Sequence, residues 1–191
     1  MRELAPTPLF SWAASVAPAR LVIARRRRRR YIAIGLGAIG SLFLPSLLGP
    51  SPRLVWNSSP SAPVGLYWVM PGQDAALGDM VIAWLPADAR RVADRRRYVP
   101  WRVPVVKRVA AVHGDRVCAF GNALAIQDRI VAVRLDADRR GRPLPRWEGC
   151  LTLGPGQVLL LTERIDSFDG RYFGATPRAL LIGRARLIWA R

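Results

Sequence analysis

The sequence predicts a mainly β domain preceded by one N-terminal transmembrane helix, and three observations support this fold class. An uncharged apolar stretch covers residues 31–48, directly behind six arginines. Short segments rich in valine, isoleucine, leucine and aromatic residues follow it, separated by turn residues. No long stretch outside 31–48 shows helical periodicity. We therefore predict a basic cytoplasmic segment over 1–30, a transmembrane anchor over 31–48 and a β domain over 49–191.

The apolar stretch has the length and the flanks of a signal anchor. Its 18 residues, YIAIGLGAIGSLFLPSLL, span about 27 Å as a helix, close to the thickness of a bilayer core. By the positive-inside rule the arginines of 25–30 stay in the cytoplasm, so residues from about 49 onward lie outside. A cleaved signal peptide is the rival interpretation, but its apolar region is normally about 7 to 15 residues long. A buried core helix is disfavoured by the adjacent arginines.

The net charge of +17 indicates an anionic partner, either nucleic acid or a membrane surface. Of the 30 basic residues, 29 are arginines. Residues 1–48 carry an excess of seven positive charges beside the apolar stretch, and the remaining positive charge is scattered along the chain. This distribution favours a membrane surface. Nucleic-acid binding would require the arginine run to act apart from the anchor.

Seven segments after the anchor have strand character, separated by turn signals such as Pro71-Gly72 and Gly154-Pro155-Gly156. These segments are Gly65–Met70, Met80–Leu85, Val103–Val112, Ala123–Ile126, Ile130–Val133, Val158–Thr162 and Leu180–Ile188. Residues 49–60 are rich in proline and serine and predict a stem close to the membrane. The polar residues 136–146 predict an exposed loop.

Lys107 is the only lysine of the chain and the first candidate for a catalytic group. Arginine cannot give up its proton in a protein, whereas a desolvated lysine can. Apolar neighbours such as Val105, Val106 and Val109 would desolvate the amine and lower its pKa. A neutral amine can take a proton from a serine hydroxyl. The alternative is a surface lysine on a strand, but this sequence uses arginine at such places.

Ser61 is the best-placed hydroxyl for such a base. It lies in NSSPSAPVG between Pro60 and Pro63, which restrict the backbone on both sides. A stretch rich in serine and proline is by itself more often a linker than a nucleophile.

The two cysteines, Cys118 and Cys150, face an oxidising compartment if the predicted topology holds. A disulfide between them would contribute roughly 3 kcal/mol to stability. The alternative is two unpaired buried thiols.

The lone histidine, His113, is the one candidate for a Ser/His/Asp arrangement, with Asp115 beside it. One histidine and two separated cysteines do not make a zinc site, and we expect no metal and no cofactor.

Three blocks in order resemble the signal-peptidase family of Ser/Lys peptidases, and more narrowly the conjugative-transfer peptidases called TraF. Residues 59–67 resemble the S-x-P-x-G-L-Y form of the nucleophile box. Residues 107–117 are similar to the K-R-V-x-x-x-x-G-D-x-V box, and residues 166–174 to the N-S-x-D-S-R-Y-W-G box. Gly78-Asp79-Met80-Val81 looks like a fourth, the G-D-x-V strand entry. The resemblance covers about residues 30–190 and implies a signal-peptidase-like β domain.

Carried onto these positions, the resemblance implies a role for each matching residue. Ser61 is the acylating nucleophile and Lys107 its general base. Ser59 and the Ser61 backbone N–H form the oxyanion hole. Ser167 orients the lysine amine, and Asp169 and Arg171 form a supporting ion pair. The alternative for that pair is a surface salt bridge worth at most about 1 kcal/mol.

Some positions depart from the pattern: Ala62 stands where a larger apolar residue is usual, Asp166 stands for Asn, Gly170 for Ser, and His113 for Pro. None removes a catalytic group. The departures favour a specialised member over a housekeeping signal peptidase.

The resemblance therefore predicts a serine endopeptidase with one pass through a bacterial inner membrane and its catalytic domain in the periplasm. The implied substrate is a membrane-inserted precursor such as a conjugative pilin subunit, and nucleic acid is not an expected partner. Four tryptophans are expected to seat the domain at the interface: Trp56, Trp68, Trp84 and Trp101. One alternative is a housekeeping type I signal peptidase. Another, of a different class, is a non-catalytic membrane-tethered assembly protein of a secretion system.

Overall fold

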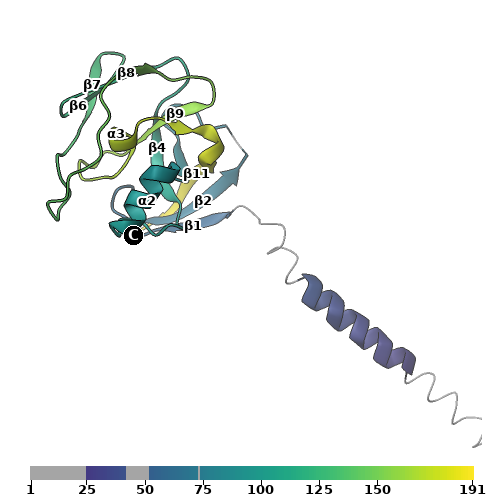
Figure 1. Ribbon diagram of the computed structural model, residues 1–191. Helices are drawn as coiled ribbons and strands as arrows, with labels where there is room; N and C mark the ends of the chain where they lie inside the picture. Colours follow the sequence, from purple (N-terminus) through teal and green to yellow (C-terminus); the bar gives the residue numbers. More distant parts are fainter. Residues whose placement is uncertain (1–24, 42–51, 73) are drawn as a thin grey trace, which may run out of the picture. The chain divides into compact units, whose positions relative to one another are not determined.

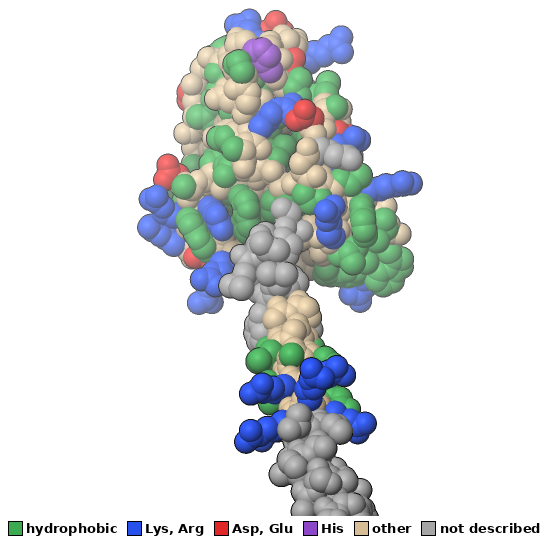
Figure 2. Space-filling model, turned by 90° about the vertical axis from the view of Figure 1, so that its right-hand side faces the viewer, with side chains coloured by type: hydrophobic (Ala, Val, Ile, Leu, Met, Phe, Trp, Pro, Cys, Tyr) green, Lys and Arg blue, Asp and Glu red, His purple; other side chains and the backbone are tan. Residues whose placement is uncertain are grey.

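The computed structural model describes residues 25–41, 52–72 and 74–191 (Figure 1). The chain divides into two units, Met1–Pro50 and Ser51–Arg191, and each is described by itself. In the first unit, residues 25–41 are helical. The arginines at its start are exposed and surround the helix (Figure 2). Among the described residues, no helix has both the length and the apolar character needed to cross a membrane. Residues 42–48 of the predicted anchor lie outside the described part.

The second unit is built on an antiparallel sheet of seven strands in the order β1-β2-β11-β3-β4-β9-β10. Its strands are β1 (Leu54–Asn57), β2 (Gly65–Pro71), β3 (Met80–Ala83), β4 (Val105–Ala111), β9 (Gln157–Leu161), β10 (Thr176–Pro177) and β11 (Leu181–Ala190). The long β11 lies between β2 and β3, so the end of the chain joins its first strands to the rest of the sheet. The close pairing of β11 with the start of β2 requires glycine at position 65, because a Cβ there would lie 2.0 Å from the carbonyl oxygen of Trp189.

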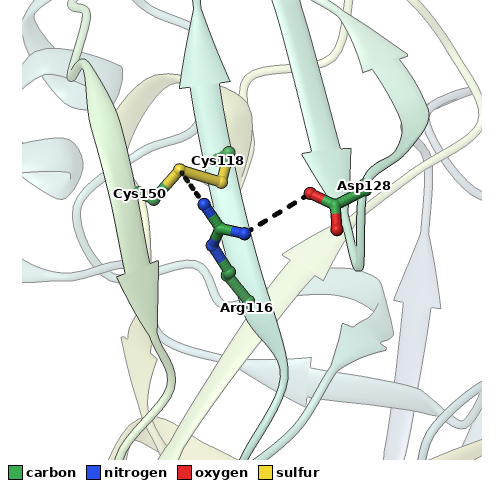
Figure 3. The surroundings of a disulfide bond; sticks show 4 residues. All are labelled: Arg116, Cys118, Asp128 and Cys150. Atoms are coloured by element: carbon green, nitrogen blue, oxygen red, sulfur yellow. Dashed lines mark hydrogen bonds and ion pairs between the residues drawn. A yellow bond between two sulfur atoms is a disulfide. The ribbon is translucent and has the colours of Figure 1, made fainter.

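A second, four-stranded antiparallel sheet has the order β7-β6-β5-β8. Its strands are β5 (Arg116–Phe120), β6 (Ala123–Ile126), β7 (Arg129–Val133) and β8 (Gly149–Thr152). Cys118 and Cys150 are directly opposite in the pairing of β5 with β8, and they form the predicted disulfide (Figure 3). Arg116 lies beside it, with Nη2 at 3.6 Å from the Cys150 Sγ and Nη1 at 3.6 Å from Asp128 (Figure 3).

Two short α-helices and one 3-10 helix are described in this unit: α2 (Ala87–Arg95), α3 (Gly170–Phe173) and η1 (Arg178–Leu180). The sequence analysis missed α2, because nine residues with only Ala89 and Ala93 buried present too short an apolar stripe. In α3, the Asp169 side chain caps the N-terminus by accepting from the Arg171 N–H. Gly170 is explained by packing, because a Cβ there would lie 2.9 Å from the Leu160 carbonyl oxygen.

The mainly β fold is confirmed, and all seven predicted strand segments contain strands of the structure. Four described strands were not predicted from the sequence: β1, which lies inside the predicted stem, and β5, β8 and β10. The core is divided into four apolar clusters along the sheets. Two of them meet the site described next: one around Ala62, Tyr67 and Val106, the other around Leu85, Val105 and Phe168.

Candidate active site

Lys107 lies in the middle of β4, opposite Val81 of β3, and only 3% of its surface is exposed. Because side chains alternate along a strand, it shares a face with the buried Val105 and Val109. This burial lowers the pKa of the amine from 10.5 to about 8. The charge of Asp169 opposes the shift and that of Arg171 adds to it. The amine therefore loses its proton at a pH far below that of a solvated lysine.

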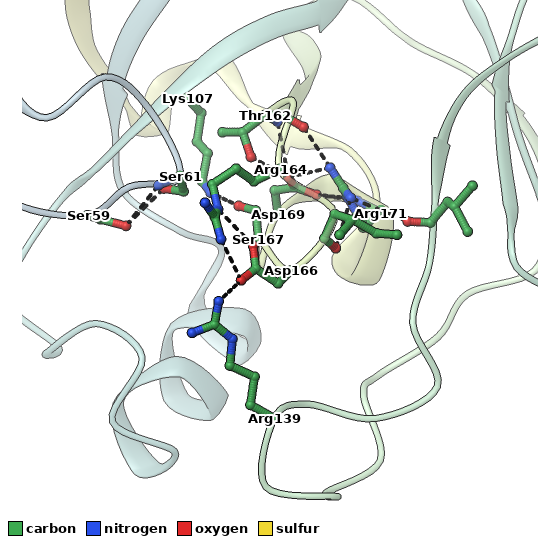
Figure 4. Close-up of polar contacts among 12 residues, drawn as sticks. Ser59, Ser61, Lys107, Arg139, Thr162, Arg164, Asp166, Ser167, Asp169 and Arg171 are labelled. Carbon is green, nitrogen blue, oxygen red and sulfur yellow. Dashed lines mark hydrogen bonds and ion pairs between the residues drawn. The ribbon is translucent and has the colours of Figure 1, made fainter.

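The Lys107 amine has a hydrogen-bond partner of its own. Its Nζ donates to the Oγ of Ser167 at 2.6 Å, and Ser167 is also buried (Figure 4). Donation to Ser167 uses one N–H of the neutral amine and leaves its lone pair available for a proton. Asp169 and Arg171, expected to form an ion pair, do so at 2.8 Å with both side chains buried.

The Arg171 guanidinium anchors the loop that carries Ser167. Besides Asp169, it donates to the carbonyl oxygens of Val133, Ile165 and Thr162. Thr162 in turn donates to Asp169 from its backbone N–H and its hydroxyl. The pair is therefore a buried junction between β9, α3 and the end of β7, not a surface salt bridge.

Ser59 and Ser61 lie in the turn between β1 and β2. Their hydroxyls are 3.0 Å apart, and the Ser61 N–H points at the Ser59 Oγ at 3.4 Å (Figure 4). The buried side chain of Asn57, at the end of β1, shapes this turn. Its Nδ2 donates to the carbonyl oxygens of Ser59, Ala62 and Pro63, and its Oδ1 accepts from the Ser59 N–H. The sequence analysis did not identify Asn57, since a single asparagine before a turn carries no specific signal.

The predicted serine and lysine groups line one cleft of about 480 Å³. Ser59, Ser61, Lys107 and Ser167 all contribute to its wall, together with apolar side chains from β1, β4 and the segment before β4. Among the described residues, no hydrogen bond joins Ser61 to Lys107: Ser61 is paired with Ser59, and Lys107 with Ser167. The arrangement thus holds a hydroxyl and a buried amine in one cavity, each with its own partner.

A further part of the wall comes from residues 136–146, predicted as an exposed loop, and from Arg96 to Tyr98 after α2. Asp138 joins these two segments. Its carboxylate accepts from the Tyr98 hydroxyl and from Arg142 Nε at 2.7 Å. The pKa of Asp138 lies well below its usual range, because these bonds and the backbone N–H groups of Arg140 and Arg142 outweigh desolvation. Sequence reasoning missed this wall, because the two segments are far apart in the chain.

His113 does not line the cleft. Its Nδ1 lies 3.1 Å from the Leu153 carbonyl oxygen, and Asp115 accepts from the Val112 N–H and from Gln127. The Ser/His/Asp arrangement therefore has no support in the geometry. Among the described residues, no cluster of three or more histidine, cysteine or acidic side chains is arranged to hold a metal ion.

The chain is similar to known proteins over most of its length. The family model described as signal peptidase, peptidase S26, matches residues 28–190. A plasmid transfer protein TraF of Escherichia coli is 33% identical over 171 residues, which cover 82% of this chain and 93% of that protein. A probable conjugal transfer protein TraF of Sinorhizobium fredii is 31% identical over 177 residues, with 85% and 91% covered. A crystal structure of a signal peptidase I from Enterococcus faecalis is 18% identical and covers 59% of this chain and 97% of that one, with a TM-score of 0.35.

Proposed function

The chain belongs to the signal peptidase family, peptidase S26, and on that premise we propose that it is a membrane-anchored Ser/Lys endopeptidase that matures a conjugative pilin precursor. The observation that carries the proposal is the buried Lys107 amine, with a pKa of about 8, in the same cleft as Ser61. A solvated lysine would be almost wholly protonated at neutral pH and could not act as a base. Burial makes a usable fraction of neutral amine available.

In the proposed reaction, the Ser61 Oγ attacks the carbonyl carbon of the scissile peptide bond as Lys107 Nζ takes the hydroxyl proton. The tetrahedral intermediate then collapses, the C–N bond breaks, and the leaving amine takes the proton from Lys107. A water molecule, deprotonated by the same amine, hydrolyses the acyl-enzyme and returns Ser61 to its hydroxyl form. Ser167 keeps the amine oriented through the 2.6 Å hydrogen bond.

Ser59 and the Ser61 N–H are the proposed donors to the oxyanion. Both lie close to the nucleophile, since the Ser59 Oγ is 3.0 Å from the Ser61 Oγ and 3.4 Å from the Ser61 nitrogen. Loss of one such donor typically costs about 10²- to 10³-fold in kcat. The Ser59 hydroxyl would exchange its bond with the nucleophile for one with the developing negative charge.

Two features support a position at the membrane. Residues 31–48 are uncharged and follow six arginines, which favours a single-pass anchor with the catalytic unit in the periplasm. Trp56, Trp68 and Trp189 are also 45%, 44% and 60% exposed on the neighbouring strands β1, β2 and β11. Exposed tryptophans of this kind are typical of membrane interfaces. Trp84 and Trp101, by contrast, enclose the Arg90 guanidinium at 4.3 Å from each ring.

The relatives named as plasmid or conjugal transfer proteins support a role in conjugation, and a pilin precursor is the substrate that we propose for this role. The test is processing of a co-expressed cognate prepilin by the wild type, Ser61→Ala, Lys107→Arg and Lys107→Met, each checked for expression and membrane fractionation. We expect only the wild type to process it. Normal processing by Lys107→Arg would refute the proposed base, because arginine keeps the charge and cannot be neutral. Cleavage of many unrelated secretory precursors would indicate a housekeeping signal peptidase instead.

A further inference from the structure

The cleft that holds Ser61 and Lys107 is also rich in arginine. Among the residues that the structure describes, six arginines and two acidic residues line it. The arginines are Arg96, Arg97, Arg139, Arg140, Arg142 and Arg164. Arg96 and Arg142 are committed to Asp138, at 4.0 Å and 2.7 Å, and so join the two segments of the wall. Of the other four arginines, Arg139 and Arg164 share one carboxylate, that of Asp166.

Arg97 occupies a position at which the chain would ordinarily place glycine. It follows α2 with a φ of 58°, and the N–H groups of Arg97 and Tyr98 bond to the carbonyl oxygens of Asp94 and Ala93. These two bonds form a Schellman motif, whose left-handed residue is usually glycine. The left-handed backbone strains a residue with a side chain. Among the described residues, the Arg97 guanidinium has no hydrogen-bond or ion-pair partner to compensate, and this side chain lines the cleft.

The position of Asp166 shows that a carboxylate fits between Arg139 and Arg164 in the wall of the cleft. Arg164 binds it with two hydrogen bonds of 2.9 and 3.0 Å, and Arg139 reaches the same carboxylate from the loop 136–146 (Figure 4). Asp166 directly precedes Ser167, the partner of Lys107. Two arginines against one aspartate leave one positive charge uncompensated. Arg140 next to Arg139 has no side-chain partner in the described part of the chain, which adds another.

We propose that Arg97, Arg139, Arg140 and Arg164 form a subsite for a carboxylate of the peptide substrate, so that the enzyme selects precursors that carry an acidic group near the cut. The inference rests on the proposed peptidase function and adds a selectivity to it. Arginine suits this task because its planar guanidinium binds carboxylates with paired hydrogen bonds and stays charged at any working pH. The carboxylate is either an aspartate or glutamate side chain or a free C-terminus, which the experiment distinguishes.

The first experiment incubates the full-length enzyme in detergent with a library of peptides derived from a digested bacterial proteome and identifies the new termini by mass spectrometry. We expect acidic residues to be enriched at one fixed distance from the cut. Cleavage absent from the wild type, or equal in Ser61→Ala, would refute the peptidase proposal itself. Cleavage that depends on Ser61 and is indifferent to charge would refute the carboxylate subsite alone.

The second experiment compares matched peptides built on the best library sequence, with the acidic residue as Glu or Gln and with a free or amidated C-terminus. We expect kcat/KM to fall about 10- to 100-fold for whichever change removes the recognised carboxylate. If Glu→Gln has the effect, the carboxylate is a side chain, and if amidation has it, the carboxylate is the terminus. No effect of either change would overturn the inference.

The variants Arg97→Gly and Arg140→Gln test the arginines without disturbing an ion pair. Both variants should reduce the ratio of kcat/KM for the Glu peptide to kcat/KM for the Gln peptide. Arg97→Gly should also raise thermal stability, because glycine fits the left-handed backbone. Loss of a residue with a purely structural role would lower thermal stability instead. Arg140→Glu should shift the preference toward a lysine peptide. Arg129→Gln, the same loss of charge on the exposed part of β7, is the control. If the arginine variants instead lose binding to phosphatidylglycerol vesicles and keep the Glu/Gln ratio, the arginines serve the membrane and the inference is wrong.

Discussion

The Nζ of Lys107 donates a 2.6 Å hydrogen bond to the Oγ of Ser167, and both side chains are buried although 60 positions separate them in the chain. The bond joins β4 to the loop before α3. The loop itself is held by Arg171, which donates to three of the surrounding carbonyl oxygens. A lysine with four flexible methylenes is thereby confined to one orientation before any substrate arrives. This confinement and the lowered pKa are separate effects of the surrounding structure.

The pH dependence of cleavage should follow the Lys107 amine. Its pKa is lowered by burial to about 8, and only the neutral amine accepts the Ser61 proton. We expect kcat/KM to rise about tenfold per pH unit below pH 8 and to level off above it. Initial rates on a prepilin peptide between pH 6 and 10 provide the measurement. A midpoint near the ordinary 10.5 would contradict the burial argument, and Lys107→Arg should be inactive at every pH.

Replacement of Lys107 by methionine should stabilise the protein at neutral pH. Below pH 8 both the folded and the unfolded chain carry the ammonium, so the wild type bears the full cost of burying it, about 3 kcal/mol. Between pH 8 and 10.5 the unfolded chain binds a proton that the folded chain does not, so the wild type gains stability as the pH rises. The lost hydrogen bond to Ser167 offsets about 1 kcal/mol.

Urea unfolding in mild detergent, followed by tryptophan fluorescence, measures this difference. Lys107→Met should exceed the wild type by about 2 kcal/mol at pH 7, and the advantage should disappear toward pH 10.5. Lys107→Arg is the matched control, since it keeps the charge at every pH and should not approach the methionine variant. A methionine variant that is less stable at pH 7 would show that the amine is solvated.

Asn57 should act on catalysis through the shape of the nucleophile turn. Asn57→Ala leaves the Ala62 and Pro63 carbonyl oxygens without their buried donor, at a cost of about 2 kcal/mol. We expect kcat to fall at least tenfold with KM changed less, because Ser61 loses its fixed position while the other lining residues of the cleft are kept. Asn57→Asp should be no better than Asn57→Ala at pH 7, since a carboxylate would face the same carbonyl oxygens. A change in KM alone would contradict a positioning role.

The disulfide should matter for stability and not for catalysis. Cys118 and Cys150 close a loop of 32 positions, which corresponds to roughly 3 to 4 kcal/mol and a Tm change of about 10 °C. Their four-stranded sheet contributes no side chain to the cleft among the described residues. The double variant Cys118→Ser/Cys150→Ser should therefore melt lower but keep kcat/KM at 25 °C within about twofold. A large loss of activity at 25 °C would indicate coupling between the two sheets.

Much of the fold was open to prediction because the apolar strand segments and the turn residues between them are local features of the sequence. All seven predicted segments contain strands, and three blocks of residues sufficed for the family, which the family model confirms. The elements that were not predicted also have local explanations. β1 has only four residues inside a stretch rich in proline and serine, and α2 is short and rich in arginine. The anchor over 31–48 and the roles of the site residues stay predictions.

By itself, the sequence determined which chemistry is available: one lysine among thirty basic residues, a serine between two prolines, and two cysteines that can pair. These are properties of residue types and of near neighbours. Only the tertiary structure decided that Lys107 is 3% exposed, that Arg171 donates to three carbonyl oxygens around it and that Asp138 joins two walls of the cleft. A pKa depends on solvent and on charges within a few ångströms, and these come from strands and loops far apart in the chain. Neither composition nor spacing specifies such contacts before the sheets form.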